Sequence, residues 1–448
     1  MKKTLTFAIM TAFIVSIIGC SSGNKEEASG KPAASGATET KAPEKVKLSL
    51  WHNYTGDDLR AQTMRATLEQ FQKDNPNIEL DVQGIPPDGY RARLKTVAAA
   101  NEMPDLFVMW PGVMTREFVG GELLQPINEL LDSKPEWKEG FLPNSFTEFT
   151  VDEKTYGAPM ALSPTSILYY NKTIFDEHNV QPPKTWDDLM NLVDTFKKAK
   201  ITPIALGNKA AWVAQSSILS SLADRVTGTE WFLKAAAGDG AKFTDPEFVE
   251  ALKHLQQLSD AKAFQDGFNS IDNTQMEQMF AQGKAAMMID GGWALTNLAA
   301  NASPEALAAM RATVLPSIPG GKGNPDSLSG VVGTGLGLSK KVEGARKDAA
   351  FKLIYAMANP EVQKKTLEGN QLVSYKVELD TSKVTPIFAE VYKLLGTVTT
   401  TPVYDGRLSS AVADVVNNGL QELLMGGNPE AIAKKIQAAH EKELAGSK

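Results

Sequence analysis

The chain has 448 residues, of which 42% are hydrophobic and 22% are charged, and this length exceeds what one hydrophobic core usually supports. Two domains are therefore expected, and the composition is that of an ordinary soluble globular protein rather than a fibrous, disordered or polytopic membrane protein. Asp and Glu number 53 against 46 Lys and Arg, so we expect no charge-driven binding to nucleic acid. One cysteine and four histidines exclude disulfide scaffolds, cysteine zinc sites and a thiol nucleophile in the mature domain.

The first twenty residues have the pattern of a secretory signal. Lys2 and Lys3 precede an apolar run from Leu5 to Ile18, which is too short to span a bilayer stably. The run ends Ile17-Ile18-Gly19-Cys20 and resembles the lipobox of bacterial lipoproteins, in which cleavage before the cysteine is followed by acylation. Residues 1–19 are predicted to be a lipoprotein signal peptide, with lipidation at Cys20. The alternative is a secreted protein with a chance cysteine.

The segment 20–45 has the composition of a tether. It contains no Ile, Leu, Val, Met, Phe, Trp or Tyr, and such a segment cannot bury enough apolar surface to order itself. Residues 1–45 hold six Lys and four Glu, so their removal leaves a net charge of −9 on the remainder. The folded part is therefore more acidic than the whole chain.

Alternating strands and helices follow the tether. Val46 to Trp51 alternates like a strand, and Thr55 and Asp58 have the spacing of a helix capping box. The predicted helix stops at Asn75-Pro76. The strand Ile78 to Val82, the helix Tyr90 to Ala100 and the strand Asp105 to Trp110 complete a β-α-β-α-β order. This order predicts an open, mostly parallel sheet.

Tryptophans recur where predicted strands end, and ligands of such sheets bind outside the carboxyl ends of the strands. Trp51 and Trp110 end two strands, Trp293 follows the strand Ala285 to Ile289, and Trp212 follows Ile204-Ala205-Leu206. An indole face suits the C–H face of a sugar ring, whose hydroxyls need polar partners in the ring plane. Short polar side chains that could serve are Asn53, Asp57, Ser163, Gln215, Asp290, Asp405 and Arg407.

Several motifs, in order and spacing, resemble family 1 extracellular solute-binding proteins, the sugar-binding subunits of ABC importers that include maltose-binding protein. These motifs are Pro104-Asp105-Leu106, Tyr156-Gly157-Ala158-Pro159, Leu168-Tyr169-Tyr170-Asn171-Lys172, Pro183-Lys184-Thr185-Trp186-Asp187, Gly283-Lys284-Ala285-Ala286-Met287-Met288 with Gly292-Trp293, and Leu315-Pro316 with Gly330 to Leu338. Thr185 is the predicted N-cap of the next helix.

The resemblance implies a two-lobed α/β fold with the ligand cleft between the lobes, like that of maltose-binding protein. One lobe would take residues 46–160 and 318–362, and the other 161–317 and 363–448. The expected partners are an oligosaccharide and the permease subunits of an ABC transporter. The expected location is the extracellular face of a Gram-positive cell membrane, where a monomer is held by its lipid anchor alone.

The resemblance also implies the site residues. Trp293 after Gly292 would stack on the sugar, Trp110 would form a second platform, and Trp51 or Tyr54 would come from the loop after the first strand. We add Asn53, Ser163, Trp212, Gln215 and Asp290 as polar or aromatic contacts, and Tyr404, Asp405 and Arg407 from the loop before the helix Leu408 to Leu424. No catalytic residue, metal ligand or cofactor is expected.

Two alternatives stay open. A secreted glycosidase or lyase would also present aromatic platforms, with two carboxylates drawn from Asp57, Asp105, Asp290 and Asp405. The same fold could instead bind a non-sugar solute: Tyr169-Tyr170 suggests a ferric ion, and the net acidity suggests a polyamine. Adjacent strand side chains point to opposite faces, however, so one of the two tyrosines is expected in the core.

Overall fold

The first hydrophobic core is built on a five-stranded sheet. A computed structural model describes residues 45–330 and 332–446 of the chain. The strands, in sheet order, are β2 (Ile78–Gly84), β1 (Val46–His52), β3 (Leu106–Met109), β12 (Gly335–Leu338) and β6 (Gly157–Pro159). β1 pairs parallel with β2 and β3, whereas β12 runs antiparallel to β3 and β6. The predicted β-α-β-α-β order is confirmed, and two strands from farther along the chain extend the sheet.

Close packing explains the glycines of β12. All four residues of β3 and of β12 are buried, as expected for strands covered on both faces. A Cβ atom on Gly337 would lie 2.4 Å from Sδ of Met109 on β3. The glycine is therefore needed for side chains of the neighbouring strand to lie against the backbone of β12.

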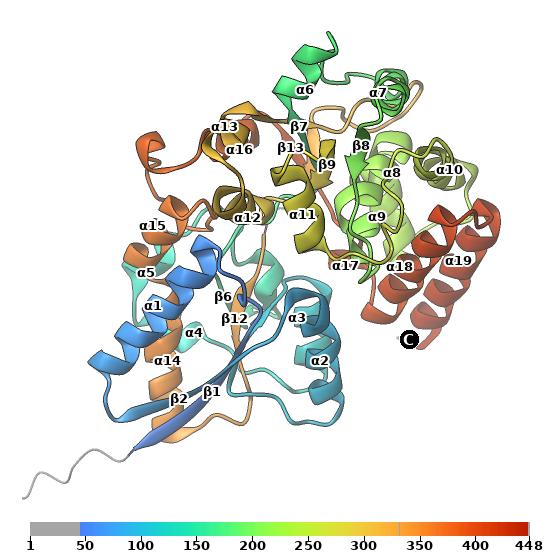
Figure 1. The fold of residues 1–448 in the computed structure, drawn as a ribbon. Coiled ribbons are helices and arrows are strands. Elements are labelled where there is room, and N and C mark those ends of the chain that lie inside the picture. Colours follow the sequence, from blue (N-terminus) through green and yellow to red (C-terminus); the bar gives the residue numbers. More distant parts are fainter. Residues whose placement is uncertain (1–44, 331, 447–448) are drawn as a thin grey trace, which may run out of the picture. The chain divides into compact units, whose positions relative to one another are not determined.

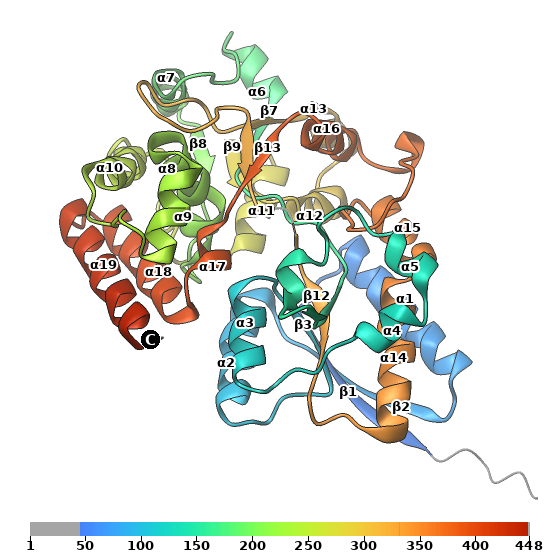
Figure 2. The same cartoon turned by 180° about the vertical axis from the view of Figure 1, so that it is seen from behind.

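Helices cover both faces of this sheet. α1 and α14 lie on one side of it and α2 and α3 on the other (Figures 1 and 2). The helices of this part are α1 (Leu59–Asp74), α2 (Pro87–Ala99), α3 (Val113–Gly120), α4 (Asn128–Asp132), α5 (Pro135–Glu139) and α14 (Gly344–Ala358), with the short 3₁₀-helix η1 (Thr147–Phe149) and the hairpin β4 (Thr150–Val151) and β5 (Lys154–Thr155).

The start of α1 differs from the prediction. The N-cap is Asp58, whose carboxylate accepts a hydrogen bond from the backbone N–H of Ala61 at 2.9 Å, so the predicted capping box beginning at Thr55 is wrong. Asp and Thr are both good N-caps, and the sequence contains both within four residues. The helix ends at Asp74, before Asn75-Pro76 as predicted.

The second core is built on a four-stranded sheet. Its strands, in sheet order, are β10 (Met310–Val314), β7 (Ile167–Asn171), β9 (Ala285–Asp290) and β8 (Thr202–Ala205). β7 runs antiparallel to β10 and β9, and β8 runs parallel to β9. Each of the two large sheets therefore contains one strand that opposes the direction of the others.

The remaining helices lie mostly around the second core. They are α6 (Lys172–Glu177), α7 (Trp186–Lys198), the π-helix η2 (Ala214–Leu219), α8 (Ser220–Thr227), α9 (Thr229–Ala237), α10 (Pro246–Asp260), α11 (Asn273–Ala281), α12 (Ala294–Asn301), α13 (Pro304–Ala309), α15 (Pro360–Glu368), η3 (Thr381–Lys383), α16 (Pro386–Leu395), α17 (Tyr404–Arg407), α18 (Ser410–Leu424) and α19 (Pro429–Gly446). Thr185 caps α7 in a capping box with Asp188, as predicted.

The chain passes between the two cores three times. The first core takes buried residues from 46–158 and 336–358, and the second takes them from 167–328 and 367–436. The passages therefore fall between 158 and 167, between 328 and 336, and between 358 and 367. The sequence predicted that the chain returns to the first lobe near residue 318, but Leu328, ten residues later, still packs in the second core. The lobe boundaries proposed from the sequence stay a prediction.

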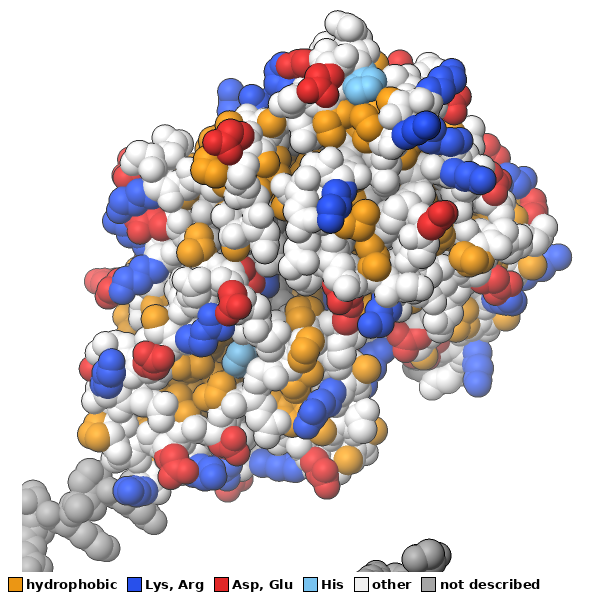
Figure 3. All heavy atoms as spheres, in the orientation of Figure 1, with side chains coloured by type: hydrophobic (Ala, Val, Ile, Leu, Met, Phe, Trp, Pro, Cys, Tyr) orange, Lys and Arg blue, Asp and Glu red, His pale blue; other side chains and the backbone are white. Residues whose placement is uncertain are grey.

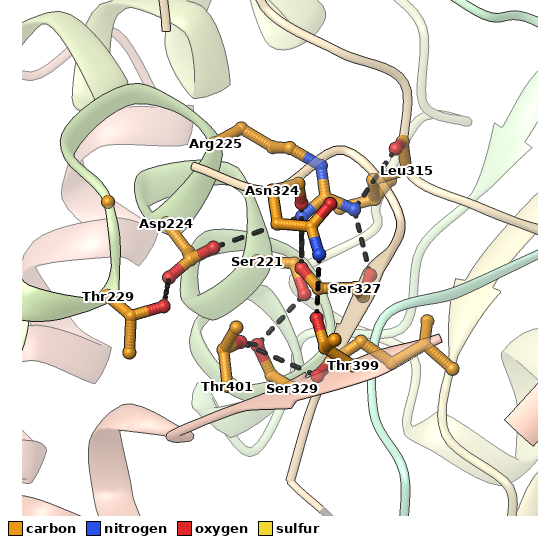
Figure 4. A network of polar contacts seen from close by, with 12 residues as sticks. Ser221, Asp224, Arg225, Thr229, Leu315, Asn324, Ser327, Ser329, Thr399 and Thr401 are labelled. Carbon is orange, nitrogen blue, oxygen red and sulfur yellow. Dashed lines mark hydrogen bonds and ion pairs between the residues drawn. The ribbon is translucent and has the colours of Figure 1, made fainter. Parts of the chain in front are cut away.

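A buried arginine holds the segment that leads into the second passage. β11 (Ser327–Ser329) and β13 (Thr399–Thr401) form a parallel pair, and Arg225 of α8 donates to Oγ of Ser327 at 2.6 Å and to its carbonyl oxygen at 2.8 Å (Figure 4). The guanidinium also donates to the carbonyl of Leu315 at 3.3 Å. Because Arg225 is 1% exposed, water could not take the place of its guanidinium as a hydrogen-bond donor to these acceptors.

Hydroxyl contacts extend this network to the end of β11. Oγ of Ser329 lies 2.8 Å from Oγ of Ser221 and 3.0 Å from Oγ1 of Thr401 (Figure 4). The backbone N–H of Gly330 donates to the carbonyl of Thr401 at 2.8 Å. The chain is therefore tied to α8 and β13 up to the residue at which it leaves the second core.

The lipobox and tether lie outside the described residues, as do Val331 and residues 447–448. Within residues 45–330 and 332–446, no helix is long and apolar enough to cross a membrane. On the face seen in Figure 3, basic and acidic side chains are interspersed rather than gathered into a patch of one sign.

Replacing Arg225 tests the network around β11. Arg225→Met should lower the free energy of unfolding by about 3 kcal/mol, because removing one partner leaves buried polar groups without hydrogen bonds. Urea unfolding measures the change. The control Arg65→Met removes an arginine whose side chain is 45% exposed and should change stability by less than about 0.5 kcal/mol. Equal effects of the two substitutions would contradict this account.

Candidate functional site

A cleft of about 710 Å³ lies where the two cores face each other. Its lining residues from the first part are Asn53, Tyr54, Thr55, Gly56, Asp58, Arg60, Pro86, Pro87, Asp88, Arg91, Ala92, Lys95, Trp110, Met114 and Thr334. Those from the second part and from the connections are Ala161, Ser163, Ala210, Trp212, Asp272, Asn273, Thr274, Glu277, Trp293, Asn297, Gln371, Asp405, Ser410, Ala413, Asp414 and Asn417. This volume is in the usual range for a small-molecule site.

Two tryptophans form the aromatic part of the second wall. The rings of Trp212 and Trp293 meet edge to face with centroids 5.5 Å apart. Nε1 of Trp293 donates to Oδ1 of Asn273 at 3.2 Å, and Nε1 of Trp212 donates to Oδ1 of Asp88 across the cleft at 3.2 Å. Both rings are half-buried, so hydrogen bonds at their edges orient indoles that still present surface to the cleft.

On the opposite wall, Trp110 is covered by an arginine. The guanidinium of Arg91 lies 4.1 Å from the centroid of the Trp110 ring, and its Nη1 is 2.6 Å from Oδ2 of Asp405. Trp110 also contacts Tyr90 at 5.9 Å between centroids. A sugar that stacked on the covered face of Trp110 would have to displace this cation from the ring.

The loop after β1 contributes polar groups to the first wall. The hydroxyl of Tyr54 lies 2.9 Å from Oγ1 of Thr334, and the backbone N–H of Tyr54 donates to Nδ1 of His52 at 3.2 Å. Asn53 is 8% exposed. These contacts hold the loop against the strand that returns from the second core.

Two carboxyl groups are buried beneath the tryptophan pair. Asp290 accepts hydrogen bonds from Nδ2 of Asn273 at 2.9 Å and from Oγ of Ser217 at 3.2 Å, while Glu277 accepts one from Asn297. Burial raises the pKa of Asp290 to about 6. Burial, followed by the charge of Asp290, raises the pKa of Glu277 well above its usual value. Asp290 therefore fixes Asn273, which in turn orients Trp293.

Several cleft side chains hold a buried oxygen that lacks a hydrogen-bond donor. These atoms are Oδ1 of Asn53, Oε1 of Gln371 and Oδ1 of Asn417. Leaving such an acceptor unsatisfied costs on the order of 1–3 kcal/mol. These oxygens are shielded from solvent as well, so they lie behind the surface of the cleft rather than on it.

Polar contacts bridge the two walls along α2 and α3. Besides the Arg91–Asp405 pair, Nζ of Lys95 lies 3.1 Å from Asp414, and Arg407 lies 3.0 Å from Glu148. The carboxylate of Glu117 accepts from the backbone N–H and the hydroxyl of Ser410 at 2.8 and 2.7 Å. These bridges join α2 and α3 to α17 and α18.

The sequence profile of the bacterial extracellular solute-binding proteins matches residues 56–364, more than half of the chain. The chain belongs to this family. The resemblance inferred from the motifs is therefore confirmed, and the family consists of binding proteins rather than enzymes.

Known relatives of this solute-binding protein agree in fold. A chitin oligosaccharide binding protein of known structure is 28% identical, with a TM-score of 0.83 over 90% of this chain and 100% of that chain. A structure from work on xylan utilization by Caldanaerobius polysaccharolyticus is also 28% identical, with a TM-score of 0.80 over 88% and 99%. The predicted two-lobed α/β fold is confirmed.

The alignments with the curated relatives cover a smaller part of the chain than the structural matches do. The multiple sugar-binding protein of Streptococcus mutans is 27% identical over 251 residues, which cover 52% of this chain and 54% of that protein. For the first curated relatives, the match spans 54–59% of their length.

The cleft of this solute-binding protein contains seven of the thirteen ligand-binding residues proposed from the sequence. Those that line it are Asn53, Tyr54, Trp110, Ser163, Trp212, Trp293 and Asp405. The structure places the other six, which are Trp51, Gln215, Asp290, Gly292, Tyr404 and Arg407, outside the lining. The assignment of individual ligand contacts stays a prediction.

The residues outside the lining have other contacts. Trp51 lies inside β1 rather than in the loop after it and packs in the first core. Tyr404 stacks on Phe232 with centroids 3.9 Å apart. Gln215 is fully buried and donates to Ser220, and Arg407 pairs with Glu148. Spacing along the chain shows that these residues follow strands but not which way their side chains point.

Asp290 and Gly292 lie outside the cleft lining and act on it through their neighbours. Asp290 is fully buried and holds Asn273. A Cβ on Gly292 would lie 2.7 Å from Cδ1 of Leu372, so the glycine permits close packing behind Trp293. Tyr169, of the alternative ferric site, is fully buried, and neither it nor Tyr170 lines the cleft. Within the described residues, no group of three or more His, Cys, Asp or Glu could hold a metal ion.

Sequence reasoning missed the polar faces of the helices that border the cleft. Asp88, Arg91 and Lys95 are spaced three and four residues apart on α2, and Asn273 and Glu277 are four apart on α11. Such spacing puts side chains on one helix face. A search of the helices that follow strands for polar residues three or four positions apart could have found these side chains.

Replacing Glu277 tests the buried carboxyl pair. A raised pKa means that the folded state keeps a proton that the unfolded state has lost above pH of about 4.5, so this group's stabilisation falls as pH rises. Glu277→Gln should therefore raise the free energy of unfolding at pH 7 by about 1 kcal/mol or more, and less at pH 4.5. Thermal unfolding across this range measures the difference, and a pH-independent difference would contradict the assignment.

Proposed function

We propose that this protein captures an oligosaccharide in the cleft and delivers it to the permease of an ABC transporter, while acylated Cys20 holds it at the cell surface. The residues around the cleft carry this proposal. A half-buried indole pair offers apolar faces, and polar side chains such as Asn53, Asn273 and Asn297 line the same cleft.

The relatives support the class of ligand. The similar proteins are named for chitin oligosaccharide, for multiple sugars and for a study of xylan utilization. A saccharide combines a C–H face with hydroxyl donors, which is the combination that the cleft residues accommodate. Its length, linkage and anomer are open.

A ligand that lies between the two walls favours closure of the cleft. A ligand that contacts both walls binds the closed form more strongly than the open form, and this difference in affinity shifts the population toward closure. The bridges from α2 and α3 to α17 and α18 stabilise the same closed form. The closed form would then be the one presented to the permease.

Trp293 tests the binding site. Trp293→Ala should weaken saccharide binding by about tenfold or more, because the stacking surface and the contact with Trp212 are both lost. Calorimetry against malto-, xylo-, chito- and galacto-oligosaccharides measures the affinity. Trp293→Phe should lose less, and Tyr392→Ala, a substitution of an exposed tyrosine outside the cleft, should leave affinity unchanged. No heat or thermal shift with any saccharide would contradict the proposal, as would multiple-turnover cleavage of one.

Cys20 tests the anchor. The wild-type protein should remain with cell membranes and partition into detergent, whereas Cys20→Ser should appear in the medium, because an acyl chain supplies the membrane affinity. The neighbouring substitution Ser21→Ala serves as a control and should leave the protein on the membrane. Membrane retention of the Cys20→Ser variant would exclude a lipid anchor at this residue.

A further inference from the structure

One side of α2 contacts the second wall of the cleft at three successive positions. Asp88 accepts a hydrogen bond from Trp212 at 3.2 Å. Arg91 pairs with Asp405 at 2.6 Å, and Lys95 lies 3.1 Å from a carboxylate of α18. Residues three and four apart share a helix face and follow one another by about 4.5 and 6 Å along the axis. The contacts between the walls therefore begin at the tryptophan pair and continue away from it along α2.

Trp110 lies at the second of these positions, with one face of its ring covered. The guanidinium carbon of Arg91 lies 4.1 Å from the ring centroid, and Nη1 of the same guanidinium is held by Oδ2 of Asp405 at 2.6 Å. Trp110 also packs against Tyr90, which is fully buried and donates its hydroxyl hydrogen to the carbonyl of Val108 at 2.8 Å. The indole is therefore held by the first core and covered by a cation.

The tryptophan pair on the second wall carries no such cover. Trp212 and Trp293 line the cleft and are half-buried. No arginine or lysine of the described residues lies over either ring. A saccharide therefore finds free indole surface at this pair and an occupied face at Trp110.

A saccharide that stacked on the covered face of Trp110 would break two contacts of Arg91 together. The cation would leave the ring, to which the π electrons attract it. It would also leave the carboxylate of Asp405, whose side chain is only 9% exposed, and a shielded charge that loses its partner is unfavourable. Because the same ion pair joins the two walls, the closed cleft would lose a bridge as well. These losses oppose extension of a ligand onto Trp110.

We propose that the Arg91–Asp405 pair limits the length of the saccharide that the cleft accepts, because it keeps Trp110 covered and ends the stacking surface at Trp212 and Trp293. Arg91 is the specificity-determining residue, and Asp405 is a positioning residue that holds the guanidinium over the ring. This inference rests on the proposed function, since it specifies the size of the saccharide that the same cleft binds.

Oligosaccharide series of increasing length test the proposal. Chito-, xylo- and malto-oligosaccharides of two to seven units are titrated into the wild-type protein by calorimetry, and the series with the lowest Kd is used for the variants. The wild-type Kd should stop falling at some length n below seven. Arg91→Ala should bind the next longer member about fivefold more tightly than the member of length n, because one more indole face becomes available.

The ratio of the Kd values for two successive lengths is the quantity that decides. A weaker closure or a small loss of stability changes both Kd values alike and leaves the ratio unchanged, so a merely structural role of Arg91 would not alter it. A wild-type Kd that still falls up to seven units overturns the proposal. An Arg91→Ala variant that keeps the wild-type length limit overturns it too.

Trp110→Ala assigns the added unit to the uncovered indole. In the wild-type background this substitution should leave the length limit unchanged, because the face of the ring is already occupied. In the Arg91→Ala background it should remove the added unit. An added unit that persists in the double variant overturns the assignment to Trp110.

Arg93→Ala is the matched control. Arg93 belongs to the same helix and lies over Trp51 at 5.0 Å from the ring centroid, and neither residue lines the cleft. Its removal should keep the wild-type limit, and a shifted limit would contradict the account. Arg91→Ala combined with Asp405→Asn removes the ion pair without leaving an unpaired carboxylate. This variant should show the same longer limit and replaces the single variant if that one is unstable.

The outcome separates this inference from the proposed function. If saccharides bind and the length limit does not depend on Arg91, oligosaccharide capture stands and only the length selection fails. If no saccharide of any series binds, the proposed function fails and this inference fails with it.

Discussion

The separation of the hydrophobic interior into two cores determines the rest of this molecule. Each large sheet is covered by helices, so the apolar surface of each half is buried within that half. What remains between the halves is the polar surface at strand ends and helix starts, crossed by three connections. A cleft with polar walls follows, because the surfaces that meet there were not needed for either core.

The cleft combines satisfied and unsatisfied polar groups. Ion pairs and the Trp212–Asp88 hydrogen bond join the walls, while Asn53 and Gln371 keep buried oxygens without donors. Buried Asp290 adds a second constraint, since it holds the asparagine that orients Trp293.

Local patterns predicted the elements better than their ends and better than the direction of side chains. The predicted N-cap at Thr185 was correct, whereas the predicted capping box at Thr55 was not, because Asp58 competes for the same role. The position of Trp293 after β9 was apparent from an apolar run followed by Asp-Gly-Gly-Trp. Trp51 looked equivalent but lies within β1 and faces the first core, and strand periodicity alone did not reveal which face was covered.

The sequence by itself determined the family and the order of the first strands and helices. These properties depend on composition and on neighbours within a few residues. Only the tertiary structure decided which distant side chains meet, such as Arg91 with Asp405 over Trp110, or Asp88 with Trp212. Those contacts join residues 314 and 124 positions apart, and they exist because two independently packed cores face each other, which no local pattern records.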